Sequence, residues 1–278
     1  MWENACSRGQ PCRVGHCSQG QDCERRRIAV SDKLATLDRC LATGITATSR
    51  SVLGTDKAVT DDPYLQLRAE MVETQIQRRG ITNSGVLRAM ATVPRHEFVP
   101  EHHRNLAYTD EPLGIGEGQT ISQPYIVAAM TEALGLRGTE RVLDVGTGCG
   151  YQAAVLAILC KEVFSIEHRP ELARAAGDRL HRLGFTNVHV HCGDGSLGLK
   201  EFGPYDAILV AAAAPKIPEP LQEQLSEGGR LIVPVGAEDH QYLMLVTRHG
   251  NEYTMERHEG CRFVPLIGRY GFRDWEFL

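Results

Sequence analysis

Residues 142–150 read Val-Leu-Asp-Val-Gly-Thr-Gly-Cys-Gly, and this stretch decides the fold. A short apolar run ends in three glycines at alternate positions, Gly146, Gly148 and Gly150, and an apolar segment follows at 151–159. Glycines let the backbone turn tightly and approach a ligand without an intervening side chain. A strand that passes through a glycine turn into a helix is the context that a nucleotide-binding loop requires.

The spacing of the glycines narrows the choice between two classes of cofactor. A dinucleotide-binding loop follows the pattern G-x-G-x-x-G. In this chain the third glycine comes one residue early, and Tyr151 stands where that pattern requires glycine. The spacing, together with Asp144 ahead of the glycines, favours S-adenosyl-L-methionine over NAD.

Two acidic residues close the next two predicted strands. Glu167 stands where a carboxylate can accept hydrogen bonds from two ribose hydroxyls. Asp194, in the sequence Cys192-Gly193-Asp194-Gly195, is placed to meet the adenine end of the same ligand. Either carboxylate alone also fits a solvated strand end, and ribose recognition does not separate NAD from S-adenosyl-L-methionine. The ordered set of loop, Glu167 and Asp194 indicates a nucleoside-containing cofactor.

Strands and helices alternate from Arg141 onward. Apolar strands that alternate with helices predict a parallel sheet covered on both faces. A brief polar–apolar alternation at the end indicates an added antiparallel edge. The predicted fold is therefore α/β, a doubly wound, mostly parallel Rossmann-like sheet with an antiparallel C-terminal edge. Strands are expected at 141–145, 163–166, 188–191, 207–210 and 230–235, helices at 151–159, 170–183 and 218–225, and a final hairpin from 242–247.

The segment before the sheet reads as helical, with one long interruption. A helix over 64–79 is expected to place Leu67, Met71 and Gln75 on one face, and a second begins at Asn83 or Ser84 and ends before Pro94. Residues 94–123 look irregular, and loops of that length in a compact domain are usually functional. A helical pattern resumes over 122–134, with Pro124 in its first turn.

The chain divides at about residue 60. Residues 1–60 are predicted to be a flexible, cysteine-containing extension, with a short helix over 31–41 as its one periodic segment. Residues 61–278 are predicted to form the catalytic domain. The extension groups four cysteines with a histidine, but their spacing matches no standard zinc pattern, and no metal is predicted there. These residues are Cys6, Cys12, His16, Cys17 and Cys23.

Composition excludes several classes of protein. Charged residues make up 23% of the chain and the formal net charge is -5, so a general nucleic-acid surface is not expected. No apolar run is long enough for a membrane span, and the N-terminus lacks the apolar core of a secretory signal. The odd number of cysteines argues against a secreted disulfide scaffold. We expect a cytoplasmic monomer without metal, nucleic-acid or membrane partners.

Several separated segments resemble the protein-L-isoaspartate O-methyltransferase family, in particular its bacterial branch. The resemblance covers about 67–270, and the Gln-Thr-Ile-Ser-Gln-Pro segment at 119–124 is specific to this family, whereas the glycine loop is shared by many methyltransferases. The other segments are Val93–Val99, Gly193–Gly195, Tyr205–Ile208, Gly228–Gly236 and Arg262–Leu266.

The resemblance implies a function and a set of site residues. Family members transfer a methyl group from S-adenosyl-L-methionine to the α-carboxylate of L-isoaspartyl residues in damaged proteins, which return to L-aspartyl through a succinimide. Ser122 matches the active-site serine. Cofactor contacts are expected from Gln119, Thr120, Asp144, Gly146, Gly148, Gly150, Glu167, Asp194 and Gly195, and substrate contacts from Ala212, Ala213, Ala214, Val264, Pro265 and Leu266.

This sequence departs from the family at two places. Cys149 stands where a serine is common, a small-for-small change that should leave cofactor binding intact. Residues 1–60 have no counterpart.

The chemistry of the expected reaction defines the role of Ser122. A carboxylate with a pKa near 4 is already ionised at neutral pH, so no general base is required. The sequence around Ser122 shows no nucleophile elbow. We therefore expect the hydroxyl to orient the attacking carboxylate; the alternative is that Ser122 caps the helix before Pro124, and the two roles are compatible.

Three other functions remain as alternatives. A methyltransferase of the same fold acting on a small molecule or RNA would share the glycine loop but not the 119–124 and 262–266 segments. A binding protein that has kept the cofactor pocket without activity is separated only by assay. An NAD-dependent oxidoreductase is disfavoured by Tyr151.

Overall fold

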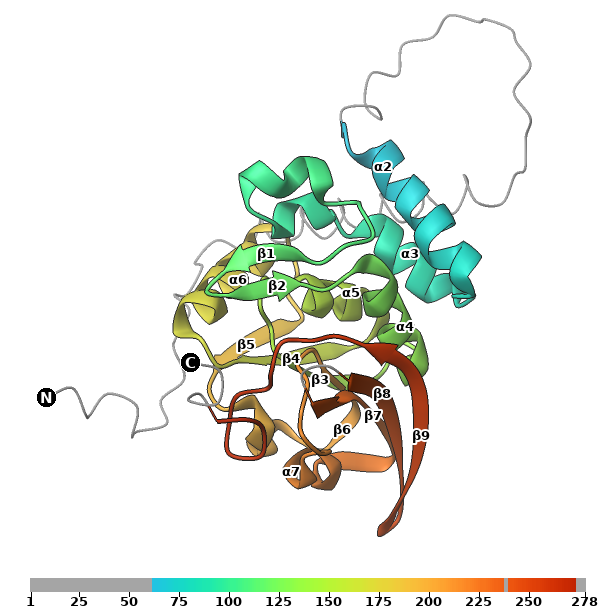
Figure 1. Cartoon of the computed structure of the whole chain (residues 1–278). Coiled ribbons are helices and arrows are strands. Elements are labelled where there is room, and N and C mark those ends of the chain that lie inside the picture. The colour runs from blue at the N-terminus through green and yellow to red at the C-terminus, as the bar shows by residue number, and fades with distance from the viewer. Residues whose placement is uncertain (1–61, 238–239, 274–278) are drawn as a thin grey trace, which may run out of the picture. The chain divides into compact units, whose positions relative to one another are not determined.

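The computed structural model describes residues 62–237 and 240–273 (Figure 1). The short helix expected over 31–41 and the cysteine–histidine cluster of the first 23 residues lie outside the described residues.

A seven-stranded sheet organises the described chain, in the order β5-β4-β3-β6-β7-β8-β9. The strands β3 to β7 pair in parallel, whereas β8 pairs antiparallel with both β7 and β9. The mostly parallel sheet and its antiparallel C-terminal edge are confirmed. The strands are β3 (Arg141–Val145), β4 (Glu162–Glu167), β5 (Val188–Cys192), β6 (Tyr205–Val210), β7 (Leu225–Ala237), β8 (His240–His249) and β9 (Glu252–Cys261).

Neighbouring residues of the strands contribute to two separate hydrophobic cores, one on each face of the sheet. Val142 of β3 belongs to the core that also contains α3, α4, α5 and part of α6, whereas its neighbour Leu143 belongs to the core that contains α7. Successive side chains of a strand point to opposite faces, so both faces of this apolar sheet must be covered. The helices are α2 (Leu65–Glu70), α3 (Ser84–Thr92), α4 (Pro124–Leu134), α5 (Tyr151–Leu159), α6 (Pro170–Arg182) and α7 (Glu219–Glu223).

The first helical segment differs from the sequence prediction. It is continuous over the expected range but changes type, from α2 to a π-helix (Met71–Ile76) and a 3₁₀ turn (Gln77–Arg79), before Gly80 ends it at φ 102°. Met71 is buried, whereas Leu67, which the periodicity placed on the same face, is 43% exposed. The adjacent Arg68 faces inward instead, because the fold provides partners for its guanidinium.

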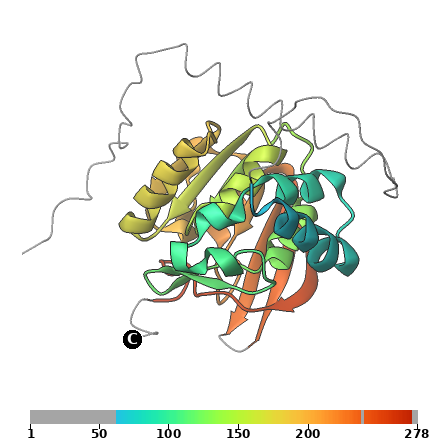
Figure 2. The ribbon, with the colours of Figure 1, turned by 90° about the horizontal axis from the view of Figure 1, so that it is seen from above.

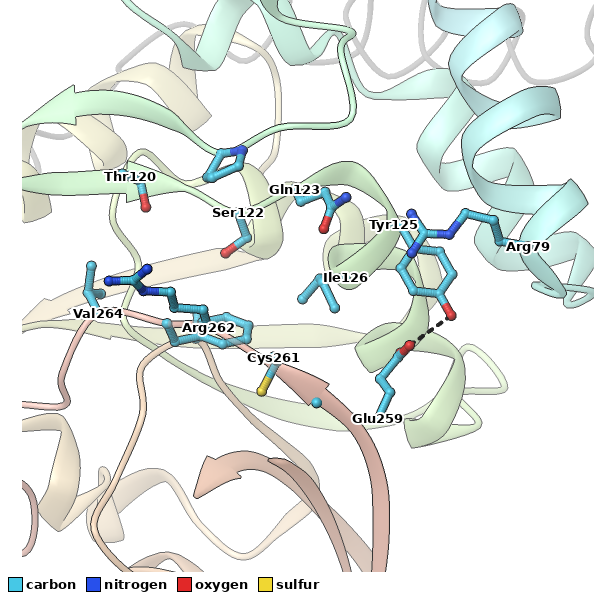
Figure 3. Close-up of a pocket in the computed structure, with 14 residues that line it drawn as sticks. Arg79, Thr120, Ser122, Gln123, Tyr125, Ile126, Glu259, Cys261, Arg262 and Val264 are labelled. Atoms are coloured by element: carbon cyan, nitrogen blue, oxygen red, sulfur yellow. Dashed lines mark hydrogen bonds between the residues drawn. The ribbon is translucent and has the colours of Figure 1, made fainter. Parts of the chain in front are cut away.

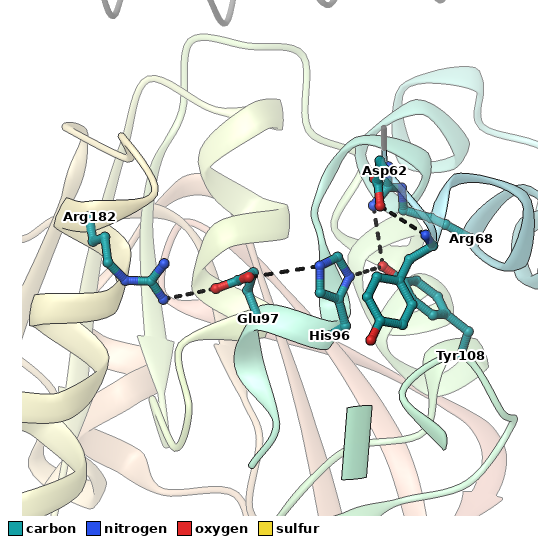
Figure 4. A network of polar contacts seen from close by, with 7 residues as sticks. Asp62, Arg68, His96, Glu97, Tyr108 and Arg182 are labelled. Atoms are coloured by element: carbon teal, nitrogen blue, oxygen red, sulfur yellow. Dashed lines mark hydrogen bonds and ion pairs between the residues drawn. The ribbon is translucent and has the colours of Figure 1, made fainter. Parts of the chain in front are cut away.

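Those partners form a polar network under α2 (Figure 4). Arg68 donates to the Tyr108 hydroxyl at 3.2 Å and forms an ion pair with Asp62 at 2.7 Å. Nδ1 of His96 lies 2.8 Å from the same Tyr108 hydroxyl. Burial lowers the pKa of His96 and raises that of Tyr108.

Glu97 extends this network to α6. Its carboxylate lies 3.8 Å from Nε2 of His96 and 2.9 Å from Nη2 of Arg182. The first helix is thereby linked through one chain of polar contacts to α6, which begins 100 positions after α2 ends. The N-terminal helices also pack beside α4 and α5 (Figures 1 and 2).

The stretch expected to be an irregular loop, 94–123, is largely structured. It contains two 3₁₀ segments (Arg95–Phe98 and Glu101–Leu106) and the hairpin of β1 (Leu113–Gly116) and β2 (Gln119–Ile121). Arg95, which is fully buried, donates to the carbonyls of Ala107 and Ser122. Long-range hydrogen bonds of this kind leave no periodic signal in the sequence, which is why the prediction missed them.

The second helix and α4 begin near the predicted residues. Asn83 caps α3 by accepting a hydrogen bond from the Val86 amide, as expected. α4 begins at Pro124 with Gln123 in the N-cap position, so Ser122 lies one residue before the cap. No helix of the described residues is long and apolar enough to cross a bilayer.

Candidate active site

Two cavities adjoin the carboxyl ends of the central strands. β4 follows β3 on one side of the sheet and β6 lies on the other, so the chain reverses its winding direction between β3 and β6. Open α/β sheets bind ligands at such a switch point. We call the cavity beside the glycine turn the loop cavity, and the cavity beside Ser122 the serine cavity.

The glycine turn has the backbone conformation that its sequence predicts. Gly146, Gly148 and Gly150 have φ values of 93°, 53° and 92°, a region that side chains rarely adopt. The Gly148 amide donates to Oε2 of Glu167 at 2.8 Å, and the Arg169 amide donates to Oε1 at 3.0 Å. Glu167 is thus held against the turn in a buried position, with lone pairs on both oxygens available for further donors.

The structure brings most of the predicted cofactor and substrate residues to the loop cavity. Its volume is about 70 Å³, whereas small-molecule sites usually measure about 300–1,000 Å³. The β1–β2 hairpin covers it, with Ile115 against Gly148 and with Glu117 lying 4.0 Å from Arg169. The predicted residues that line this cavity are Gln119, Thr120, Gly146, Gly148, Glu167, Gly195, Ala212, Val264, Pro265 and Leu266.

Asp144 lies beneath the turn and does not line either cavity. It is fully buried, and Oδ2 accepts a hydrogen bond from Ser165 at 2.6 Å, while Oδ1 has no hydrogen-bond partner among the described residues. Burial raises the pKa of this carboxyl to about 7, and the charge of Glu167 adds to the shift. A buried, unsatisfied carboxylate oxygen next to the turn suits a ligand that carries positive charge.

Gly150 and Asp194 also lie outside the lining, and both have structural contacts. A Cβ at Gly150 would lie 3.1 Å from Leu180 of α6, so the glycine permits close packing of that helix. Asp194 accepts hydrogen bonds from the amides of Ser196 and Arg269, at 2.9 and 2.8 Å. It thus holds the C-terminal segment in place, while the following Gly195 reaches the cavity.

The serine cavity is larger, with a volume of about 360 Å³ (Figure 3). Ser122 points into it, and the Ser122 carbonyl accepts a hydrogen bond from buried Arg95 at 2.8 Å. The Ser122 side chain has no hydrogen-bond partner among the described residues, and the N-cap position belongs to Gln123. The alternative that Ser122 caps α4 was therefore wrong, and the hydroxyl faces the cavity.

The two cavities meet. Thr120, Ala211 and Val264 line both of them. The loop cavity and the serine cavity are therefore neighbours at these three residues.

The predicted substrate segments form one wall at this junction. The Ala213 amide donates to the carbonyl of Val264, and the Leu266 amide donates to that of Ala213, at 2.8 and 2.7 Å. These bonds fix Val264 at the boundary of the two cavities. Ala213 and Ala214 are fully buried and line neither cavity, so they act through the backbone.

Several cavity residues were not predicted from the sequence. Arg262 lies in a segment that the sequence singled out, but its exposed side chain gave no separate signal. Tyr125 and Glu259 share a hydrogen bond of 3.0 Å across 134 positions of sequence, and Arg79 stacks on the Tyr125 ring at 3.4 Å. Only the folded chain brings these residues together.

The histidines do not gather into a metal site in the described ranges. The residues of 62–237 and 240–273 contain no group of three or more His, Cys, Asp or Glu side chains that could hold a metal ion. His189 lies instead 3.4 Å from Glu162.

Comparison with known proteins identifies the family. The family model described as protein-L-isoaspartate(D-aspartate) O-methyltransferase matches residues 66–271. The chain is 56% identical over 208 residues to protein-L-isoaspartate O-methyltransferase 2 of Marinobacter nauticus, covering 74% of this chain and 95% of that protein. It is 54% identical over 212 residues to the protein-L-isoaspartate O-methyltransferase of a Picosynechococcus species, covering 76% and 95%.

Comparison with solved structures points to the same family. A structure named protein-L-isoaspartate O-methyltransferase superposes with a TM-score of 0.67 at 31% identity, covering 73% of this chain and 67% of that one. A Plasmodium falciparum structure described as a beta-aspartate methyltransferase in complex with S-adenosyl-L-homocysteine gives a TM-score of 0.64 at 29% identity, covering 72% and 98%. The chain belongs to the protein-L-isoaspartate(D-aspartate) O-methyltransferase family.

Proposed function

We propose that this protein methylates the α-carboxylate of L-isoaspartyl residues in damaged proteins and peptides, with S-adenosyl-L-methionine as the methyl donor. The observation that carries this proposal is the junction of the two cavities at Thr120, Ala211 and Val264. One cavity has the features of a nucleoside-binding turn, and the other contains the family's serine.

The loop cavity suits the donor. Glu167, fixed by two backbone amides, is placed to accept hydrogen bonds from ribose hydroxyls. Gly146 and Gly148 allow the backbone to approach the methionine part, and buried Asp144 supplies negative charge beneath it. S-adenosyl-L-methionine, when bound, supplies an electrophilic methyl group on a cationic sulfonium.

The serine cavity suits the acceptor. We assign to Ser122 the donation of a hydrogen bond that orients the acceptor carboxylate. Arg262 has no ion-pair or hydrogen-bond partner among the described residues, and it faces the same cavity near Thr120 and Val264 (Figure 3). We assign to it the attraction of the anionic acceptor.

These residues need only position the acceptor and remove water from it. The acceptor carboxylate, with a pKa of about 4, is ionised at neutral pH and needs no base. Holding the reacting atoms close and aligned is itself a large part of catalysis. Burying the anion in the cavity removes its water shell, and the hydrogen bond from Ser122 replaces part of it.

The remaining expectations concern the setting of the reaction. We propose a cytoplasmic monomer that acts on damaged proteins and peptides, without metal, nucleic acid or membrane as partner, and with residues 1–60 as a flexible extension of the methyltransferase domain. The runner-up function, methylation of a small molecule or RNA by the same fold, would use the same loop cavity with a different acceptor.

A pair of matched peptides tests the proposal. The protein is incubated with methyl-labelled S-adenosyl-L-methionine and with two peptides that differ only in an aspartyl or isoaspartyl linkage. We expect base-labile label on the isoaspartyl peptide alone. Equal labelling of both peptides, or labelling of neither while RNA or a small molecule is labelled, would overturn the assignment.

A further inference from the structure

The serine cavity has two ends with different charges (Figure 3). Arg262 lies at the end next to Thr120 and Val264, where the two cavities join. Tyr125 and Glu259 lie at the opposite end, with Ser122 between the two ends. A peptide whose carboxylate lies at Ser122 and whose chain continues away from the junction would pass Tyr125 and Glu259.

The positive charge at this opposite end is already matched. The Arg79 guanidinium forms an ion pair with Asp110 at 2.7 Å and stacks on the ring of Tyr125 at 3.4 Å. An arginine that is paired with a carboxylate and stacked on an aromatic ring presents little net charge to an incoming ligand.

The negative charge of Glu259 is not matched in the same way. Its Oε2 accepts a hydrogen bond from Tyr125, which is a neutral donor, and the side chain is exposed to solvent. No ion pair of Glu259 with a cationic side chain is found in the described part of the chain. The pKa of Tyr125 is raised, first by burial and then by its hydrogen bond to Glu259 and by the charge of Glu259, while the charge of Arg79 acts in the opposite direction. Glu259 therefore brings to this end a negative charge that no cation among the described residues pairs with directly.

We propose that Glu259 makes the enzyme selective for isoaspartyl sites that have a cationic residue beside the isoaspartate. A lysine or arginine that extends toward Tyr125 meets an uncompensated carboxylate, whereas a glutamate there is repelled by it. The Tyr125 hydroxyl holds the carboxylate in position. This inference rests on the proposed function, because it needs the isoaspartyl carboxylate beside Ser122.

Three isoaspartyl peptides, with lysine, glutamine or glutamate beside the isoaspartate, test this assignment. Each is made with the variable residue on either side, and kcat/KM is measured at low and at high salt. For the wild type we expect the lysine peptide to exceed the glutamate peptide by about fivefold to tenfold on one side, because exposed charge pairs are weak individually. The ratio should shrink at high salt.

Two substitutions on the same strand separate Glu259 from its surroundings. Glu259→Gln keeps an acceptor for Tyr125 but removes the charge, and we expect the lysine-to-glutamate ratio to fall to about one to two. Glu256→Gln removes an exposed carboxylate of β9 that lines neither cavity, and we expect it to keep the wild-type ratio. A variant ratio for Glu259→Gln equal to that of the wild type would overturn the proposal.

The glutamine peptide separates a failure of the Glu259 proposal from a failure of the proposed methyltransferase function. If the wild type does not methylate the glutamine-flanked isoaspartyl peptide, the proposed function fails. If it methylates that peptide but treats lysine and glutamate alike on both sides, only the role of Glu259 is overturned.

Discussion

Ser122 and the glycine turn occupy different cavities, so their contributions are separable by substitution. Ser122→Ala removes one hydrogen-bond donor beside the acceptor and leaves the lining of the loop cavity unchanged. We expect kcat to fall about 10- to 100-fold, since a hydrogen bond to a charged group contributes about 1.5–3 kcal/mol. The affinity for S-adenosyl-L-homocysteine, measured by calorimetry, should stay within about twofold. A parallel loss of that affinity would contradict the division of roles.

Asp144 predicts a pH dependence of cofactor binding. Burial raises its pKa to about 7, so the carboxyl is largely neutral at about pH 6 and charged at about pH 8. Only the charged form attracts a cationic ligand. We therefore expect the affinity for S-adenosyl-L-methionine to increase from about pH 6 to about pH 8.

Two controls isolate this effect. Asp144→Asn should bind more weakly at about pH 8 and lose the rise, although His168, which also lines the loop cavity, is still present. S-adenosyl-L-homocysteine, which lacks the sulfonium charge, should show a smaller rise with the wild type. An affinity of S-adenosyl-L-methionine that is flat across this range in the wild type would rule out Asp144 as its source.

Individual residues were predicted well where local sequence sets their conformation. The three glycines form the predicted tight turn, with positive φ values, and Glu167 lies against it. The prediction did not separate residues that touch the cavity from those that support it, such as Asp194. That distinction depends on how the C-terminal segment packs against the residues around Asp194. These contacts join positions far apart in the sequence, so local sequence does not predict them.

At the scale of elements, the strand–turn–helix unit predicts a structural cost for changing its last glycine. Gly150→Ala forces a side chain to φ 92° and places a Cβ 3.1 Å from Leu180. The backbone strain alone costs about 1–3 kcal/mol, and the contact with α6 adds to it. Gly138→Ala is the matched control, because it has φ 105° and nothing within 4 Å of the added Cβ. Urea unfolding should show a larger loss of unfolding free energy for Gly150→Ala than for Gly138→Ala. Equal losses would show that the contact with Leu180 has no energetic cost.

The accuracy of element prediction followed the strength of local periodicity. The bounds of β3 and α5 agree with the prediction because a continuous apolar run, a glycine turn and an apolar helix define them locally. The β1–β2 hairpin was missed because its seven central residues are mostly glycine and polar residues without clear alternation. Leu67 is exposed although the periodicity placed it on one face with Met71, and the burial of its neighbour Arg68 depends on Asp62 and Tyr108.

At the scale of the whole molecule, the network around His96 predicts acid sensitivity. The pKa of His96 is lowered by burial, so the unfolded chain binds more protons than the folded chain below an ordinary value of 6.5. The contribution of His96 is therefore present above that pH and lost as the pH falls. Asp144 contributes with the opposite sign, since its raised pKa favours the folded state at low pH and this contribution is lost as the pH rises through about 7.

A variant separates these two contributions. His96→Asn should show a smaller decrease of the unfolding free energy between about pH 7 and about pH 5 than the wild type. His181→Asn, at an exposed position, should match the wild-type slope. The measurement is urea unfolding at each pH. Equal slopes for wild type and His96→Asn would exclude the network as the source.

The central claim is that one molecule holds donor and acceptor in two cavities that join at Thr120, Ala211 and Val264. The most direct measurement is a crystal structure of the full chain with S-adenosyl-L-homocysteine and an isoaspartyl peptide. We expect the ribose hydroxyls at Glu167, the sulfur facing the junction and the peptide carboxylate within hydrogen-bond distance of the Ser122 hydroxyl. A nucleoside bound away from the glycine turn, or a peptide carboxylate that reaches neither Ser122 nor the junction, would contradict the account.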